Sequence, residues 1–411
     1  MKNRLLLAGA LSVTALTVAA TAYQQSTIID NSTVNINPAP IVKLPPVDKN
    51  TLQHNQWPKV ELVFALDTTS SMSGLINAAK ENIWSIATTM ASAQPAPQIS
   101  IGLIAFRDRG DAYITKRIEL SDDLDQIYIQ LLGLQAQGGG DGPESVNAAL
   151  FDAVNKMNWS SDPDSYKVVF LVGDAPGHNN YPNDVPFQVT LADAAKKGII
   201  VNTIQAGNDS NMVQAWQTIA SLGKGDTFQV SQQGSAVAVA TPFDKEIAAA
   251  AESYEETRMY YGSEAEQKTQ KERIISSGKM KRTASDSSMA RRAKYNLTAS
   301  GEKNFAGSKE LIQAIENDSV SLDDIAESEL PAVMRSMEVE EQKIYIQEKV
   351  QQRRQLKSEL QALTEKRDAF IKKELAKSDG GKDSLDEKLM TTLKKQASAK
   401  GMDYSESSSS Y

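Results

Sequence analysis

The chain has 411 residues, of which 40% are hydrophobic and 23% are charged, the composition of a soluble globular protein with room for two or three domains. Cysteine is absent, which excludes disulfides, thiolate metal sites and cysteine nucleophiles. The only histidines are His54 and His178, so a histidine-rich zinc site is excluded as well. The net charge of -8 argues against binding of nucleic acid, which usually needs a basic surface.

The N-terminus has the pattern of a secretory signal. Lys2 and Arg4 precede an apolar run over residues 5–20, and Ala20-Thr21-Ala22 fits a small-x-small cleavage site. We therefore expect residues 1–22 to be a cleaved signal peptide and the mature protein to be periplasmic or secreted. The run is short for a membrane span, and an uncleaved anchor is the alternative.

Residues 23–57 are rich in Pro, Thr and Asn, which predicts an extended linker. From residue 58 to about 260, apolar strands alternate with amphipathic helices. This alternation predicts a three-layer α/β domain, with a mostly parallel sheet and helices on both faces. The expected strands span residues 60–66, 99–106, 113–120, 168–172, 199–204 and 227–230. The expected helices span residues 74–93, 124–134, 187–197, 212–222 and 242–260, with one more that follows Glu144.

A mainly α-helical region is expected after residue 260. Residues 261–335 are polar and basic, with short helices predicted at 304–315 and 322–330. The basic groups at 279–282 and 291–294 could contact an anionic membrane surface, but we favour a solvated, partly flexible segment. Residues 379–411 are expected to hold a short helix and a disordered Ser-rich tail.

Residues 336–378 are expected to form one long helix, over Val339–Leu375, because this stretch contains no Gly or Pro. Apolar residues form a seam with 3,4 spacing, and basic residues interrupt it. The pattern fits either an imperfect coiled coil, through which the chain could self-associate, or a helix hairpin on a second domain. The seam consists of Ile346, Leu356, Leu360, Leu363 and Phe370, and the interruptions are Lys349, Arg353 and Arg367.

Oxygen-bearing side chains follow the first strand of the α/β domain. Asp67, Thr69 and Ser71 come directly after the apolar run that ends at Leu66. Such a position lies at the carboxyl edge of a parallel sheet, where open α/β folds bind ligands. One carboxylate and two hydroxyls suit a hard divalent cation, Mg²⁺ or else Mn²⁺ or Ca²⁺, better than zinc.

Two further acidic residues are expected at the same carboxyl edge of the sheet. Asp141 lies in the glycine-rich stretch 137–144 before a helix, and Asp174 follows the strand at 168–172. These three loops, in this order, resemble the von Willebrand factor A-like (vWA) domains that carry a metal-ion-dependent adhesion site (MIDAS), of the type found in exported bacterial proteins. Thr69 stands in place of the first Ser of the motif, and Asp141 stands where the family usually has Thr.

The resemblance implies a division of roles among these residues. Thr69 and Ser71 would bind the ion directly, whereas Asp67 and Asp174 would act largely through bound water. Asp141 could do either, as in the subset of family members that carry Asp at this place. The alternative for Asp141 is a helix cap, because Asp141-x-x-Glu144 has the spacing of a capping box.

The expected function is a binding protein in the cell envelope, which makes divalent-metal-dependent contacts with a protein partner for adhesion or scaffolding. One alternative is a metal-assisted hydrolase in which His178 or Glu144 acts as the base. The other is a structural envelope protein whose metal only stabilises the fold. Because no nucleophile arrangement and no placed general base are visible, we expect that the protein is not an enzyme.

Overall fold

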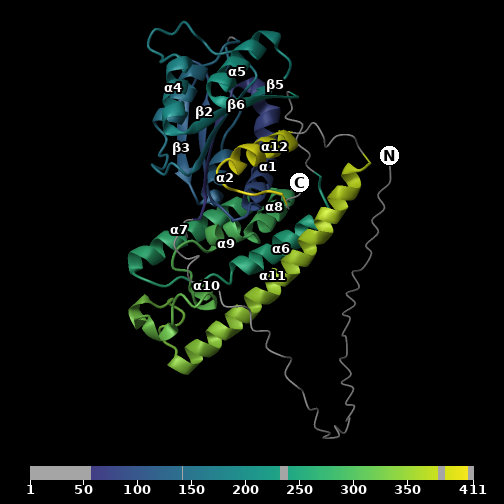
Figure 1. Ribbon diagram of the computed structural model, residues 1–411. Helices are drawn as coiled ribbons and strands as arrows, with labels where there is room; N and C mark the ends of the chain where they lie inside the picture. The colour runs from purple at the N-terminus through teal and green to yellow at the C-terminus, as the bar shows by residue number, and fades with distance from the viewer. Residues whose placement is uncertain (1–56, 141, 232–238, 378–384, 406–411) are drawn as a thin grey trace, which may run out of the picture. The chain divides into compact units, whose positions relative to one another are not determined.

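A six-stranded sheet with the order β3-β2-β1-β4-β5-β6 forms the centre of the fold (Figure 1). β3 runs antiparallel to β2, and every other neighbouring pair is parallel. The computed structural model describes residues 57–140, 142–231, 239–377 and 385–405, so the expected signal peptide and nearly all of the expected linker lie outside the described residues. The strands are β1 (Lys59–Asp67), β2 (Gln98–Phe106), β3 (Thr115–Ser121), β4 (Tyr166–Gly173), β5 (Ile199–Ala206) and β6 (Lys224–Val230).

Helices cover both faces of this sheet, which confirms the predicted three-layer α/β architecture. Along β1, Leu62 and Leu66 join the core beneath α1 and α2, whereas Val63 and Ala65 join the core beneath α3, α4 and α5. This alternation follows from the two-residue repeat of a strand that is buried on both faces. The helices are α1 (Ser73–Ala91), α2 (Leu124–Leu132), α3 (Val146–Asn155), α4 (Phe187–Lys197) and α5 (Ser210–Leu222).

The first face of the sheet also receives a helix from the end of the chain, α12 (Leu385–Ser398). Leu389 and Leu393 of α12 are buried in the same core as α1, and so are Met402 and Tyr404 beyond its end. Polar contacts fix the position of α12, since Gln396 exchanges hydrogen bonds with Asn202 of β5. The core of the α/β domain therefore extends beyond the segment at residues 58–260.

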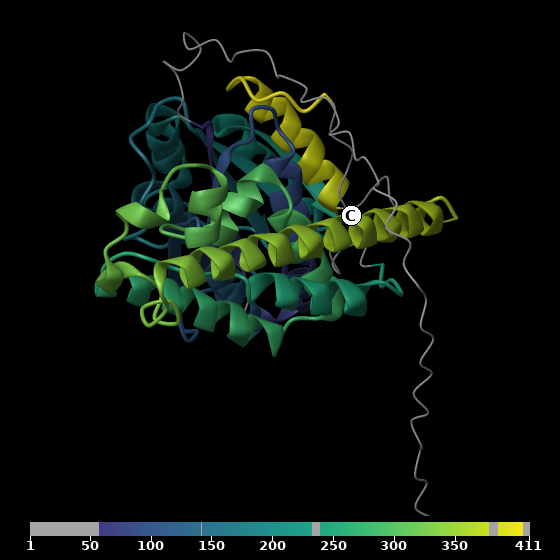
Figure 2. The ribbon, with the colours of Figure 1, turned by 90° about the horizontal axis from the view of Figure 1, so that it is seen from below.

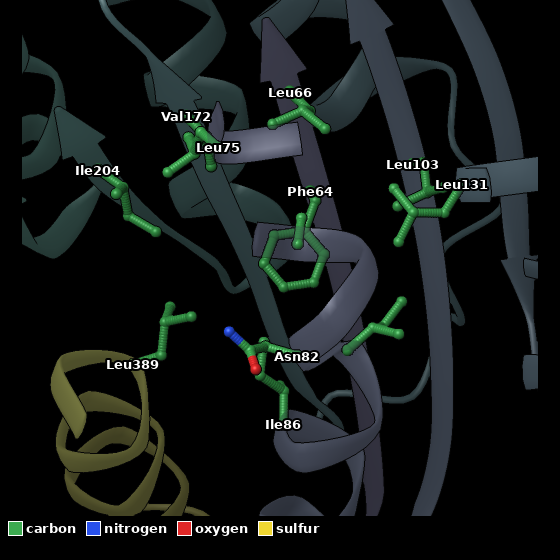
Figure 3. Close-up of a pocket in the computed structure, with 12 residues that line it drawn as sticks. Phe64, Leu66, Leu75, Asn82, Ile86, Leu103, Leu131, Val172, Ile204 and Leu389 are labelled. Atoms are coloured by element: carbon green, nitrogen blue, oxygen red, sulfur yellow. The ribbon is translucent and has the colours of Figure 1, made fainter. Parts of the chain in front are cut away.

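A small cavity of about 30 Å³ lies between α1, the sheet and α12 (Figure 3). Its walls are apolar, with Phe64 and Leu66 on the sheet side and Leu389 on α12. The exception is Asn82 of α1, which is 1% exposed and whose Nδ2 has no hydrogen-bond partner within the described part of the chain. This amide is a local flaw in otherwise apolar packing.

A helical region lies between the sheet strands and α12 in sequence. The expectation of a solvated segment around residues 267–294 was wrong for the second basic group, because Arg291 and Arg292 of α8 are buried, whereas Lys279 and Arg282 at the end of α7 are exposed as expected. Arg291 pairs with Glu81 of α1, and Arg292 pairs with Asp125 of α2. These two arginines are thus internal ion-pair partners. The region contains α6 (Asp244–Glu255), α7 (Glu264–Lys281), α8 (Asp286–Asn296), α9 (Ala299–Ala306) and α10 (Leu311–Glu316).

Two short helices differ from their predictions. The helix expected at 304–315 is divided into α9 and α10, because Gly307 (φ 65°) and Lys309 (φ 60°) take left-handed backbone conformations. The helix expected at 322–330 is absent from the described residues of that stretch, which instead form two 3-10 turns, η3 (Leu322–Asp324) and η4 (Glu327–Glu329). Like charges four residues apart, as at Asp323 and Glu327, disfavour a continuous helix there.

The long helix α11 spans Val339–Leu375, as predicted, and is uninterrupted (Figure 2). Its apolar seam packs within the chain, with Leu360 and Leu363 in one core with α6 and α8. The interrupting arginines are buried too, since Arg353 pairs with Glu310 and Arg367 pairs with Asp244. No helix among the described residues is both long enough and apolar enough to cross a membrane.

Candidate metal centre

The first loop gathers three of the predicted ligands at the end of β1. Asp67 is the last residue of β1, and its Oδ1 accepts hydrogen bonds from the backbone N (2.8 Å) and the Oγ1 (2.7 Å) of Thr69. The Thr69 Oγ1 lies 3.4 Å from the Ser71 Oγ. Asp67 and Thr69 are 1% and 2% exposed, whereas Ser71 is exposed to solvent. The loop then forms the 3-10 turn η2 (Ser70–Met72) and enters α1.

The hydrogen bond between Thr69 and Asp67 prepares the threonine to bind a cation. A hydroxyl has one proton and two lone pairs. Because Thr69 donates its proton to Asp67, the lone pairs of its oxygen stay available to a positive ion. With a cation in place, Asp67 would be ionised behind this oxygen, so the pair would present a neutral ligand that a carboxylate supports.

Asp174 follows β4, the strand that pairs in parallel with β1. The two loops approach closely, because a Cβ added to Gly173 would lie 3.3 Å from the Asp67 Cβ. The charge of Asp174 acts on Asp67 and contributes to raising its pKa. The structure therefore brings Asp174 to the same edge as the first loop, as the spacing of the motifs predicts.

The middle loop is bound to the first loop by its backbone. The Gln137 N donates to the Thr68 O (3.0 Å), and the Ser70 Oγ donates to the Gly138 O (2.8 Å). Gly139 has a φ of 84°, and an added Cβ there would lie 3.2 Å from the Thr69 Cβ, so this close approach requires glycine. The loop is held beside the predicted ligands.

Asp141 itself lies outside the described residues, so its role as a ligand stays a prediction. The alternative capping box is wrong, because α3 begins at Val146 and the residue before it is Ser145. Glu144 is thus not a helical residue. It stands two positions before the helix, next to the loop that follows β4.

Negative charge dominates the electrostatics of this edge. Burial raises the pKa of Asp67 to about 7, against the hydrogen bonds from Thr69, which lower it. Burial, together with the negative charge of four neighbouring carboxylates, raises the pKa of Glu144 to about 9. These neighbours are Asp67, Asp108, Asp111 and Asp174. An edge with this charge favours a cation.

One buried cation of the protein lies within this acidic edge. Arg107 is 5% exposed, and its charge lowers the pKa of Asp67. Its Nε donates to the Thr68 O (3.2 Å), and its guanidinium lies over the Tyr113 ring at 4.5 Å. Arg107 thus ties the first loop to the end of β2. No sequence pattern indicated a role for this residue beyond its place after an apolar strand.

The donor set fits a hard cation that is held mainly by hydroxyls. Across the residues whose placement is described, no three His, Asp or Glu side chains group closely enough to hold a metal ion on their own. As the family resemblance implies, Thr69 and Ser71 would be the inner ligands, with the carboxylates Asp67 and Asp174 behind them. Neutral oxygen donors with supporting carboxylates suit Mg²⁺ or Mn²⁺, which keep several waters.

Residues 61–241 match the family model of the von Willebrand factor A domain, and this segment of the chain is such a domain. The chain is also similar to the alpha-protein kinase vwkA of Dictyostelium discoideum, at 27% identity over 169 residues. That match covers 39% of this chain and 27% of vwkA, so the chain spans about a quarter of the length of this relative.

Three solved structures of other proteins are similar to part of this chain. Proximal thread matrix protein 1 from the mussel byssus, with a zinc-occupied MIDAS motif, is 16% identical with a TM-score of 0.35, and the match covers 43% of this chain and 42% of that one. The SpRpn10 VWA domain is 13% identical with a TM-score of 0.33, covering 43% and 89% of the two chains. The pilus adhesin SpaC from Lactobacillus rhamnosus GG is 16% identical with a TM-score of 0.33, covering 43% and 28%.

Proposed function

We propose that the von Willebrand factor A domain at residues 61–241 binds a divalent cation at the carboxyl edge of its sheet and uses it to hold a protein partner in the cell envelope. The domain belongs to a family that often mediates metal-dependent protein interactions. The observation that carries the proposal is the hydrogen bond from Thr69 to Asp67, because it leaves the threonine oxygen ready for an ion. The exposed Ser71 hydroxyl marks the side from which a partner would approach.

The chemistry of the partner follows from the ligand set. Two neutral hydroxyls leave most of the charge of the cation uncompensated, so an acidic side chain of the partner would complete its coordination. If Asp141 also binds the ion, the ion is held more tightly and attracts that acidic group less strongly.

Cation binding is tested by the melting temperature of the purified protein in chelator and in rising Mg²⁺, Mn²⁺ or Ca²⁺. A ligand that binds only the folded state raises the melting temperature with its concentration. Asp67→Ala should abolish this dependence. Thr218→Ala is the matched control, because its exposed hydroxyl donates to the Gln214 O within α5, away from the three loops, and its cation dependence should stay unchanged. Asp141→Thr should alter the cation affinity, and an unchanged affinity would show that Asp141 is not a ligand.

Partner binding is tested by affinity capture from envelope extracts, in Mg²⁺ and in chelator. We expect capture that is lost in chelator and lost with Asp67→Ala. Capture that persists in both conditions would support the alternative in which the metal only stabilises the fold.

The other alternative is a metal-assisted hydrolase, and we propose that the protein does not have this activity. His178, the histidine nearest the third loop, has its ring stacked on Tyr181 with 4.4 Å between centroids. Its Nδ1 lies 3.1 Å from the Asn180 Oδ1, and its Nε2 lies 3.4 Å from the Asp108 Oδ2. These contacts fit a ring that orders the loop. His178→Ala should therefore leave partner capture nearly unchanged, whereas cation-dependent turnover of an ester, phosphate or peptide that this variant lacks would overturn the proposal.

The proposed location rests on residues 1–22 alone. N-terminal sequencing of protein recovered from the periplasm or the medium should give a start near Tyr23. Membrane-bound protein that retains Met1 would reject cleavage.

A further inference from the structure

We propose that Glu144 is an additional oxygen ligand of the cation, so that the middle loop contributes a carboxylate next to Thr69. This inference rests on the cation site of the proposed function and assigns it a residue that the motif does not contain.

The backbone of Glu144 joins the second and third loops of the site. Its N donates to the Pro176 O (2.9 Å), and its O accepts from the His178 N (2.9 Å). These bonds form a short parallel bridge between Glu144 and Gly177. Glu144 is therefore held in place by the loop that carries Asp174, and its side chain has little freedom to leave the site.

The side chain of Glu144 faces the first loop across Gly139. A Cβ added to Gly139 would lie 3.8 Å from the Glu144 Oε1 and 3.2 Å from the Thr69 Cβ. Both Glu144 and Thr69 thus lie against the same glycine. The missing side chain of this glycine lets the Glu144 carboxylate and the Thr69 side chain approach each other at the edge of the sheet.

Glu144 has one oxygen without a partner. The residue is 3% exposed, and its buried Oε2 has no hydrogen-bond partner in the described residues. A buried carboxylate oxygen without a donor is costly, and native structures rarely keep one unless water or an ion fills the place. A cation at this edge would satisfy it.

The neighbouring carboxylates differ from Glu144 in this respect. Asp108 accepts hydrogen bonds from the Ser145 Oγ (2.8 Å) and the Tyr181 OH (2.7 Å). Asp111 accepts from the Gly139 N (3.2 Å), and Asp67 accepts from Thr69. Groups of the protein donate hydrogen bonds to these side chains, whereas none in the described residues donates to the Oε2 of Glu144.

Two Glu144 variants separate the role of its charge from its role as a ligand. Glu144→Gln keeps the shape and cannot ionise among the neighbouring carboxylates, so in chelator it should melt higher than the wild type, while its cation affinity falls at least tenfold. Glu144→Ala removes the ligand, and water should take its place. Terbium luminescence lifetimes in H₂O and D₂O, with Tb³⁺ as the probe ion, should then show one more bound water than in the wild type.

Asp108→Asn is the matched control, because it removes one nearby negative charge at a side chain that the protein already satisfies. It should leave the number of bound waters unchanged. If both Glu144 variants keep the cation affinity and hydration of the wild type while Asp67→Ala loses binding, the role of Glu144 is refuted and the cation site stands. If the wild type binds no cation, the site and this inference fall together. A purely structural Glu144 would make Glu144→Gln melt lower in chelator, which also refutes the proposal.

Discussion

Replacing Arg292 by methionine should test how the helical region is joined to the α/β domain. Arg292 of α8 is 1% exposed. Its Nε and Nη2 donate to the two carboxylate oxygens of Asp125 in α2, at 2.5 and 2.6 Å, and its Nη1 donates to Glu255 of α6. One guanidinium therefore bridges a helix of the domain and a helix of the C-terminal region.

The expected loss follows from what the variant leaves behind. Burial alone would raise the pKa of Asp125, but the charge and hydrogen bonds of Arg292 outweigh it and hold that pKa below its ordinary value. Glu255 keeps Arg258 and Lys281 as partners, so most of the penalty falls on Asp125. Removing one partner of a buried ion pair costs about 3–5 kcal/mol, and we expect Arg292→Met to lower the free energy of unfolding by that amount.

Urea unfolding followed by circular dichroism measures this loss. Arg354→Met is the control, because Arg354 pairs with Glu316 at 2.9 Å but is 69% exposed, and it should change stability by less than about 1 kcal/mol. Adding Asp125→Leu to Arg292→Met removes the stranded charge and should recover part of the loss. The buried pair of Arg292 and Asp125 does not stabilise the fold as described if Arg292→Met unfolds at the same urea concentration as the wild type. The same conclusion follows if the double variant is less stable than the single one.

Two further outcomes are expected from the core and the metal edge. Asn82→Leu should raise the free energy of unfolding by about 1 kcal/mol in urea titrations. The variant removes an amide whose Nδ2 lacks a partner in the described residues, and it fills an apolar cavity. A loss of stability would show that the amide stabilises the fold. In chelator, the melting temperature should fall as the pH rises from about 4 to about 8, because folded Asp67 keeps its proton up to about pH 7 whereas an ordinary Asp releases it near 3.8. Excess Mg²⁺ should flatten this fall, and equal slopes with and without the cation would contradict a shared site at Asp67.

The sheet and the first loop could be predicted because both depend on short-range patterns. The apolar run from Val60 to Leu66 is buried on both faces, and a strand of that kind belongs in the middle of a parallel sheet. The polar residues that follow it can only lie at its carboxyl edge. Thr69 and Asp67 are two residues apart, so their hydrogen bond is a local event.

The role of the basic segment could not be predicted, because it depends on contacts between distant parts of the chain. Arg291 and Arg292 look solvated when only their polar neighbours in sequence are considered. Their partners Glu81 and Asp125 lie more than 160 residues away in the sequence, and no short-range sequence pattern indicates these pairings. Glu144 was not predicted as a ligand for a related reason, since its spacing from Asp141 suggested a capping box while its actual neighbours come from the loop after β4.

The position of α12 affects how stably residues 58–260 can fold alone. That fragment contains every strand and α1 to α5, but it lacks α12, whose Leu389 and Leu393 are 1% exposed in the core beneath α1. Since burying a leucine contributes roughly 1.5–3 kcal/mol, the fragment should melt below the full chain. α1 begins at Ser73, two residues after Ser71, so a loosened α1 should also weaken cation binding.

A peptide of residues 385–405 tests this directly when it is added to the fragment. It should raise the melting temperature in a saturable way, and a peptide with Leu389→Asp and Leu393→Asp should not. The packing of α12 on this face contributes little to the domain if the fragment has the same melting temperature as the full chain. The same conclusion follows if the peptide does not change the melting temperature of the fragment. The fold of the metal edge would then depend on the sheet alone, because β1 and β4 pair side by side whether or not α12 covers them.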